Sequence, residues 1–228
     1  MTTLALPVSR RLDVLAGALA PTLGGGDHAA ARERLVELAA AAPLAAAGGV
    51  PVSLIAASAF GVDLRMLALV VLAPIIAGLL VRMAVHRPTR RLAAQAAAAG
   101  VLATLLYDLC RGGFLWTGLM DHDPIPHIGT ALGLDPAWAA GYAWRYLGNG
   151  TGLALTFLAL GLRGTWVGIL YGLAVCSGLL LTLVISPFGT TILFPLSVTT
   201  VIMATLGHAI YGAALGTLAA RAHQRSVH

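Results

Sequence analysis

Residues 165–185 read TWVGILYGLAVCSGLLLTLVI and include no charged side chain. A helix needs roughly 20 apolar residues to cross a bilayer, because each residue adds about 1.5 Å along the helix axis. This stretch therefore predicts a transmembrane helix, and it sets the class of protein to which the chain belongs.

The rest of the chain has the same character. Of its 228 residues, 58% are hydrophobic and only 10% are charged, with a mean hydropathy of +0.87. A soluble domain has roughly 25% charged residues. We therefore expect an all-α, polytopic transmembrane helical bundle of about six spans. The expected spans cover about 43–61, 66–84, 92–117, 137–161, 165–185 and 192–217.

Three regions follow from this pattern. Residues 1–42 predict an N-terminal cytoplasmic or membrane-surface helical segment, with a solvated tail as the alternative. Residues 43–220 form the transmembrane domain, and 221–228 a cytoplasmic tail. Segment 43–61 is the weakest of the spans because it contains Pro43, Gly48, Gly49 and Pro51. Pro74 is expected to kink the second span, since proline removes a helical hydrogen bond.

The charges predict an orientation. The net charge is +5, yet the chain has no lysine, and its arginines lie between apolar runs. That distribution is typical of cytoplasmic loops and argues against nucleic-acid binding. With six spans, one side holds Arg10, Arg11, Arg32, Arg34, Arg82, Arg87, Arg90, Arg91, Arg163, Arg221 and Arg225. We therefore expect a multi-pass protein of a bacterial inner membrane with both termini cytoplasmic.

Small residues predict how the spans pack. Gly148/Gly152, Gly164/Gly168/Gly172 and Gly212/Gly216 are spaced four apart, which lets helix backbones approach closely in lipid. Spans four to six are therefore expected to form a tight unit. Cys110 and Cys176 lie inside apolar segments, where we interpret them as packing residues rather than a disulfide or metal pair.

Ionisable side chains inside spans are costly, so they are candidates for function. Asp108 and Arg111 lie three residues apart and share a helix face. Arg111 alternatively reaches the outer headgroups and neutralises Asp108. Arg145 is expected at a similar depth, so an Asp108–Arg145 pair is sterically reasonable. His208 is a candidate ligand or a hydrogen-bonded packing residue.

Span four has an aromatic and polar stripe. Its members are spaced three or four apart, as on one continuous helix face, which should point into the bundle or a cavity. The stripe consists of Trp138, Tyr142, Arg145, Asn149, Gly152 and Thr156. With His208 it predicts a polar cavity that opens outward, with Asn149 and His208 at its floor.

The loop Asp121–His127 has two carboxylates and two imidazoles, which suit a divalent metal. Pro124 and Pro126 favour extended backbone before them, which would separate His122 from His127 by roughly 15 Å. We therefore interpret the loop as a lid or an ordinary interfacial loop, and predict no metal. No nucleotide-binding or metalloprotease motif is present, and no cofactor is predicted.

A set of short motifs resembles a pattern found in small uncharacterised bacterial multi-span membrane proteins. The resemblance covers roughly residues 92–217 and implies no known activity. Where that pattern has an aromatic–His pair before Asn-Gly, this chain has Trp144 and Arg145. The matching residues are Tyr107-Asp108, Arg111, Tyr146, Asn149-Gly150, Gly207-His208 and Tyr211-Gly212.

Three functions remain open at this stage. The first is a membrane-embedded enzyme on a lipophilic or amphiphilic substrate, with Asp108, His208 and Tyr142 as catalytic groups. Arg111 or Arg145 would then hold an anionic group, and Asn149, Tyr107 and Tyr146 would also contact the substrate. The second is a small transporter or channel with an Asp108–Arg145–His208 relay. The third is an accessory protein. Expected partners are membrane lipids and a lipophilic small molecule; a homo-oligomer is left open.

Overall fold

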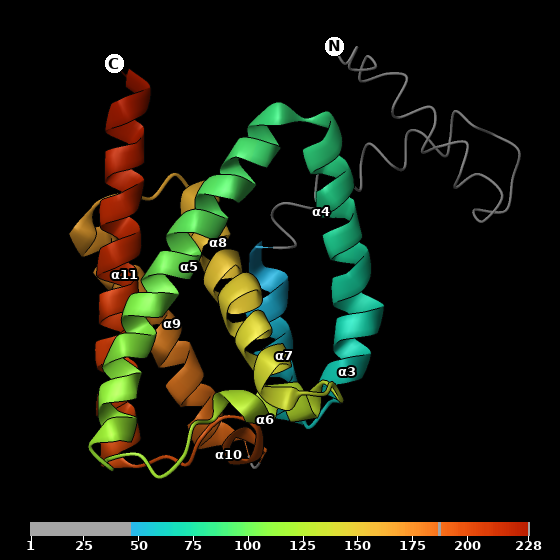
Figure 1. Ribbon diagram of the computed structural model, residues 1–228, viewed down its shortest axis with the longest axis vertical. Helices are drawn as coiled ribbons and strands as arrows, with labels where there is room; N and C mark the ends of the chain where they lie inside the picture. The colour runs from blue at the N-terminus through green and yellow to red at the C-terminus, as the bar shows by residue number, and fades with distance from the viewer. Residues whose placement is uncertain (1–46, 187, 228) are drawn as a thin grey trace, which may run out of the picture.

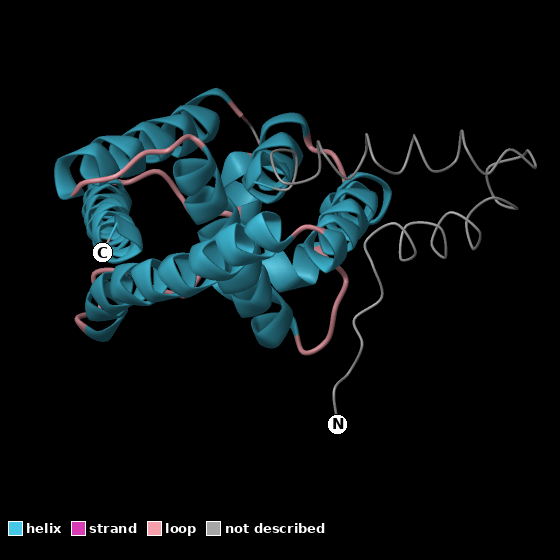
Figure 2. Cartoon of the chain, turned by 90° about the horizontal axis from the view of Figure 1, so that it is seen from above, coloured by secondary structure: helices cyan, strands magenta, loops and turns pink. Residues whose placement is uncertain are grey.

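The structure is a computed structural model that describes residues 47–186 and 188–227. In that part of the chain there are helices, turns and loops but no strand (Figure 2). The expected all-helical architecture is confirmed. The predictions for residues 1–42 lie outside the described residues.

The bundle contains three long helices, α5 (Arg87–Trp116), α9 (Thr165–Ile185) and α11 (Val198–Val227), and α11 packs against both of the others (Figure 1). Glycine governs the contact between α9 and α11: a Cβ at Gly168 or Gly212 would overlap the other's carbonyl group. Gly164 N–H donates to the Gly216 carbonyl at 3.0 Å across the same interface. The predicted glycine packing therefore holds for the fifth and sixth segments.

The fourth segment packs differently from the expectation. Its Gly148 faces the side chain of Val50, and its Gly150 lies against Gly100 and Thr104 of α5. The expected unit of spans four to six therefore needs correction, because the closest packing of Gly148 and Gly150 is against the helix Ala47–Phe60 and α5.

A peripheral helix connects to α5 at the sharp turn near His86. It is made of α3 (Leu64–Leu67), η2 (Ala68–Leu72) and α4 (Ala73–Val85). Pro74 follows directly on the π-helical turn η2, which accommodates the missing proline N–H. None of the residues of α4 is buried, so this helix presents apolar side chains outward.

The expected fourth span is one helical run in three parts: α7 (Ala137–Ala143), the π-helix η3 (Trp144–Gly150) and α8 (Thr151–Ala159). Two short helices, α6 (Ile125–Ala131) and α10 (Gly189–Ile192), lie in the connections at one end of the bundle (Figure 1). Helix α6 packs tightly on α7, where Gly129 faces the Ala137 carbonyl and Gly141 that of Ile125.

Several boundaries shift for local reasons. Helix α5 begins at Arg87 rather than near 92, because the His86 side chain accepts from Thr89 N–H and caps it. Helix α11 begins at Val198 rather than 192, where Ser197 Oγ accepts from Thr200 N–H after Pro195. The same helix continues to Val227, so the segment expected to be a tail from residue 221 extends it.

Four helices within the described residues are long and apolar enough to cross a membrane: Leu64–Val85, Arg87–Trp116, Thr165–Ile185 and Val198–Gln224. The apolar helix Ala47–Phe60 is shorter. The run 137–159 contains Arg145, Asn149 and several glycines, which make it less apolar than these four. The structure thus supports a membrane-embedded helical bundle.

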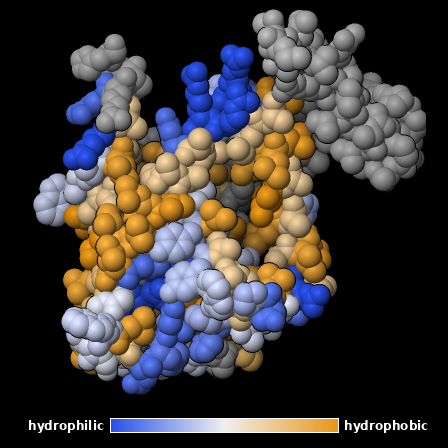
Figure 3. Space-filling view, viewed as in Figure 1, coloured by the Kyte–Doolittle hydropathy of each residue, from blue (hydrophilic) through white to orange (hydrophobic). Residues whose placement is uncertain are grey.

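The two ends of the bundle differ in charge. Figure 3 shows an apolar band between hydrophilic side chains at both ends. The end at the α4–α5 turn, which we call the arginine end, contains Arg87, Arg90, Arg91 and Arg163. The opposite end, at α6 and α10, contains Asp63, Arg65, Asp121, Asp123 and Asp135. Trp116 and Trp138 at the opposite end and Trp166 near the arginine end are exposed, as interfacial tryptophans are.

Candidate functional site

Asp108 joins two arginines from different helices. Its Oδ1 accepts from Arg145 Nε at 2.7 Å and lies 3.3 Å from Arg111 Nε on the same helix. The Asp108–Arg145 pair suggested by the sequence is therefore present. Tyr146 lies near enough to interact with the Asp108 carboxylate through its hydroxyl. Asp108 thus ties α5 to η3.

Arg111 does not extend to the surface. Only 3% of it is exposed, so the alternative in which it reaches the outer headgroups is wrong. Its Nη1 pairs with Asp123 Oδ1, and its Nη2 donates to Tyr142 Oη at 3.0 Å. Tyr142 in turn donates to Asp123 Oδ2 at 2.7 Å. Arg111 is held between two carboxylates and a hydroxyl.

Asp123 is the residue that sequence reasoning missed as part of this cluster. Besides its bonds to Arg111 and Tyr142, Asp123 accepts at Oδ1 from the backbone N–H of Ile125 at 3.1 Å, at the start of α6. Its position in a loop 12 residues after Arg111 gave no periodic signal. The only sequence clue was an Asp two residues before the Ile-Pro that opens a helix.

An aromatic contact links α5 to α11. The Arg145 guanidinium lies 4.5 Å from the centre of the Tyr107 ring, a cation–π distance. The other neighbour of that ring is His208, edge-on at 5.1 Å. A Cβ at Gly207 would lie 2.6 Å from Tyr107 Cζ, so the ring fits only because position 207 is glycine.

The orientation of His208 is fixed by one hydrogen bond. Its Nδ1 lies 2.8 Å from the backbone carbonyl of Ala204. A carbonyl only accepts, so Nδ1 carries a hydrogen, and in the neutral ring Nε2 is then an acceptor. His208 thus has one ring nitrogen engaged by its own helix and the other available to a ligand.

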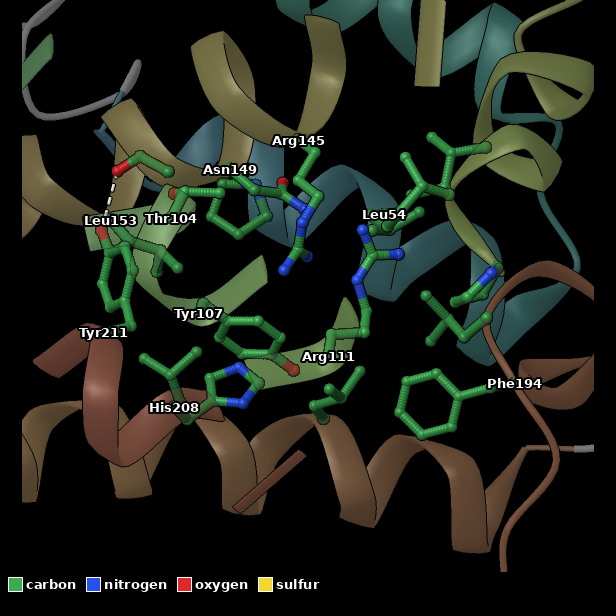
Figure 4. Close-up of a pocket in the computed structure, with 18 of the residues that line it drawn as sticks. Leu54, Thr104, Tyr107, Arg111, Arg145, Asn149, Leu153, Phe194, His208 and Tyr211 are labelled. Carbon is green, nitrogen blue, oxygen red and sulfur yellow. Dashed lines mark hydrogen bonds between the residues drawn. The ribbon is translucent and has the colours of Figure 1, made fainter. Parts of the chain in front are cut away.

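These residues surround a cavity of about 130 Å³. In Figure 4, Arg145 and Asn149 approach from one side and Tyr107 and His208 from the other, while Leu54 and Phe194 lie beyond Arg111. Most of the wall is apolar. It is contributed by Pro51, Leu54, Ile55, Thr104, Tyr107, Arg111, Pro124, Ile125, Ile128, Arg145, Asn149, Gly150, Leu153, Val175, Leu179, Ile192, Leu193, Phe194, Met203, His208 and Tyr211.

The candidate residues divide into two groups. Tyr107, Arg111, Arg145, Asn149 and His208 line the cavity. The other three are not part of its wall: Asp108 and Tyr142 bond to the arginines, and Tyr146 stacks on Tyr142 with ring centres 6.2 Å apart. The cavity expected to be polar is mainly apolar, with its polar groups concentrated around Arg145.

The stripe predicted on span four does not continue along one face. The π-helix η3 has more residues per turn than an α-helix, which shifts the face presented after Gly150. As a result Arg145, Asn149 and Leu153 line the cavity, whereas Gly152 and Thr156 do not. Trp138, at the start of the stripe, is exposed.

The Asp121–His127 region corrects another expectation. Residues from Ile125 on form α6, so the backbone turns and the His122 and His127 rings lie 5.4 Å apart rather than at opposite ends of an extended loop. Even so, the described residues contain no group of three or more His, Cys, Asp or Glu side chains that could hold a metal ion.

Comparisons with protein families, curated proteins and solved structures gave no match. A function is therefore inferred from the geometry of the cavity and the charges beside it.

Proposed function

We propose that this integral membrane protein binds a lipophilic or amphiphilic small molecule in the cavity between the helix Ala47–Phe60, α5, η3, α9 and α11. One observation supports this most strongly. The wall is mainly apolar but includes Asn149 and His208, and the buried Asn149 Oδ1 has no hydrogen-bond partner among the described residues. Ligand sites have this mixture of an apolar wall and a few placed polar groups.

We also propose that Ala47–Phe60 and the run 137–159 cross the membrane, which gives six spans. The arginine end would then be cytoplasmic, as the positive-inside rule predicts, and the cavity would lie toward the outer side. In Figure 1 both segments lie alongside the longer helices, with Ala47–Phe60 starting well below the α4–α5 turn; this alignment supports the topology.

Cysteine labelling tests the topology. Asp121→Cys and Arg163→Cys would each be made in a chain whose Cys110 and Cys176 are replaced by alanine. A membrane-impermeant maleimide should label position 121 in intact cells and position 163 only after lysis. The reverse pattern would contradict the orientation, and equal labelling would contradict the six-span count.

Ligand binding is tested with a matched pair of substitutions on α9. Leu179 lines the cavity, whereas Leu181, two residues later, is 58% exposed. Purified wild-type protein should retain a small molecule, detected by native mass spectrometry. Leu179→Trp should lose it because the indole fills the cavity, and Leu181→Trp should keep it. If the wild type retained nothing and took up no added amphiphile, binding would be refuted.

A second candidate, an enzyme with acid–base chemistry, is favoured by His208. This residue lines the cavity with Nδ1 engaged by Ala204, which leaves Nε2 toward a ligand. Asp108 has a different role in this proposal: it neutralises Arg111 and Arg145 rather than exchanging protons. His208→Gln should then abolish turnover of a retained ligand while binding persists; loss of binding as well would favour a binding role alone.

A further inference from the structure

The charges around the cavity decide what kind of polar group fits it. Two arginines contribute to the wall, which at first favours an anionic ligand. Each of them, however, already faces carboxylate: Arg145 pairs with Asp108, and Arg111 with Asp108 and Asp123. Two positive charges are matched by two negative charges, so no uncompensated positive charge remains for an anion.

Two acceptors remain unpaired beside Arg145, and one cavity-lining donor, Arg111 Nε, is also buried without a hydrogen-bond partner among the described residues. Asn149 Oδ1 is buried without a partner among the described residues, and leaving a buried oxygen unpaired destabilises the protein. His208 offers Nε2 as a second acceptor because its Nδ1 donates to Ala204. A ligand that donates hydrogen bonds would satisfy groups that an anion could not.

The dimensions of the cavity limit the ligand further. An apolar protein cavity of about 150 Å³ accommodates benzene, and this one measures about 130 Å³. Leu54 and Phe194 supply apolar contacts away from Asn149 (Figure 4). The cavity is partly open, and the space inside it fits a single ring or a short branched chain that ends in one polar group.

From the proposed binding function and these contacts we infer that the ligand is an uncharged molecule with a hydroxyl group, such as a phenol or a short lipophilic alcohol. Its hydroxyl donates to Asn149 Oδ1 or His208 Nε2, and its apolar part lies toward Leu54 and Phe194. The arginine–carboxylate cluster is then a neutral wall that holds Arg145 in place beside the ligand.

Three probes of similar size separate the chemical classes: phenol, benzoate and toluene. The thermal unfolding midpoint of the full-length protein in lipid nanodiscs would be measured with each. The same series with Leu179→Trp, whose cavity is filled, corrects for partition into lipid. After this correction phenol should raise the midpoint most, because it alone is neutral and donates a hydrogen bond.

The Asn149→Leu variant tests whether the ligand's hydroxyl bonds to Asn149. The phenol affinity should fall about fivefold, which is the contribution of roughly one hydrogen bond, while that for toluene should be unchanged. The comparison of phenol, benzoate and toluene uses only the wild type and Leu179→Trp, so the inference remains testable if Asn149→Leu does not fold. A larger shift with benzoate, or equal shifts with phenol and toluene, would overturn the inference but leave the binding function standing. No cavity-dependent shift with any probe would overturn both.

Discussion

The α9–α11 interface and the α5–η3 interface join helices in opposite ways. In the first, Gly164, Gly168, Gly212 and Gly216 bring two backbones into direct contact over several turns. In the second, the backbones meet closely where Gly100 faces Gly150, and beyond that point long charged side chains span the gap. A dry glycine contact leaves no space for a ligand, whereas helices held apart by Asp108 and Arg145 border a cavity.

The largest expected effect comes from the glycine interface. Gly168→Leu should destabilise the protein by at least about 4 kcal/mol, because a side chain there forces α9 away from the Gly212 carbonyl. Unfolding by sodium dodecyl sulfate in mixed micelles measures the loss. Gly178→Leu on the same helix is the control, since a Cβ at Gly178 meets no atom within 4 Å. Equal losses for both would show that the interface is not tight.

The second effect concerns the charged interface. Asp108→Asn should cost about 3 kcal/mol, because it leaves Arg145 buried without a carboxylate. The same unfolding titration measures it, with Asp121→Asn at an exposed position as the control. A loss below about 1 kcal/mol, typical of a surface ion pair, would mean that water screens the cluster.

The smallest effect probes the boundary between the two interfaces. Tyr211 on α11 donates its hydroxyl to the Gly150 carbonyl at 2.7 Å. Tyr211→Phe should destabilise by about 1 kcal/mol. Amide hydrogen exchange should rise within Trp144–Gly150 and remain unchanged in Thr165–Ile185. Faster exchange across both helices would instead indicate a general loss of packing.

The sequence predicted features that depend on local composition. The apolar run 165–185 coincides with α9, because the length of an apolar stretch and its flanking glycine are properties of that stretch alone. The Asp108–Arg145 pair could also be predicted, because the helical rise along two expected spans places both residues at a similar depth in the membrane. The glycine contact of α9 with α11 followed from spacing.

Features that depend on register and on contacts distant in the sequence escaped prediction. Nothing in the sequence of residues 144–150, WRYLGNG, indicates a π-helix. The change of helix face that brings Leu153 rather than Gly152 to the cavity therefore could not be predicted. Asp123 lies in a loop, and only the folded chain brings it to Arg111. The α6 helix was missed because the two prolines were interpreted as extending the backbone, whereas Pro126 lies in its first turn, where proline is tolerated.

The π-helix η3 also affects how the chain tolerates changes in length. A π-turn holds one residue more than the α-helix it interrupts, so removing one residue here would regularise the helix without rotating α7 relative to α8. Leu147 is the natural candidate, because it lies inside η3 with 68% of its surface exposed and so contributes little to the core. A deletion elsewhere in a span would turn every later side chain by about 100°. A one-residue deletion within η3 would instead leave the later side chains in place. The cavity would lose only the π-helical turn that positions Asn149 beside Arg145.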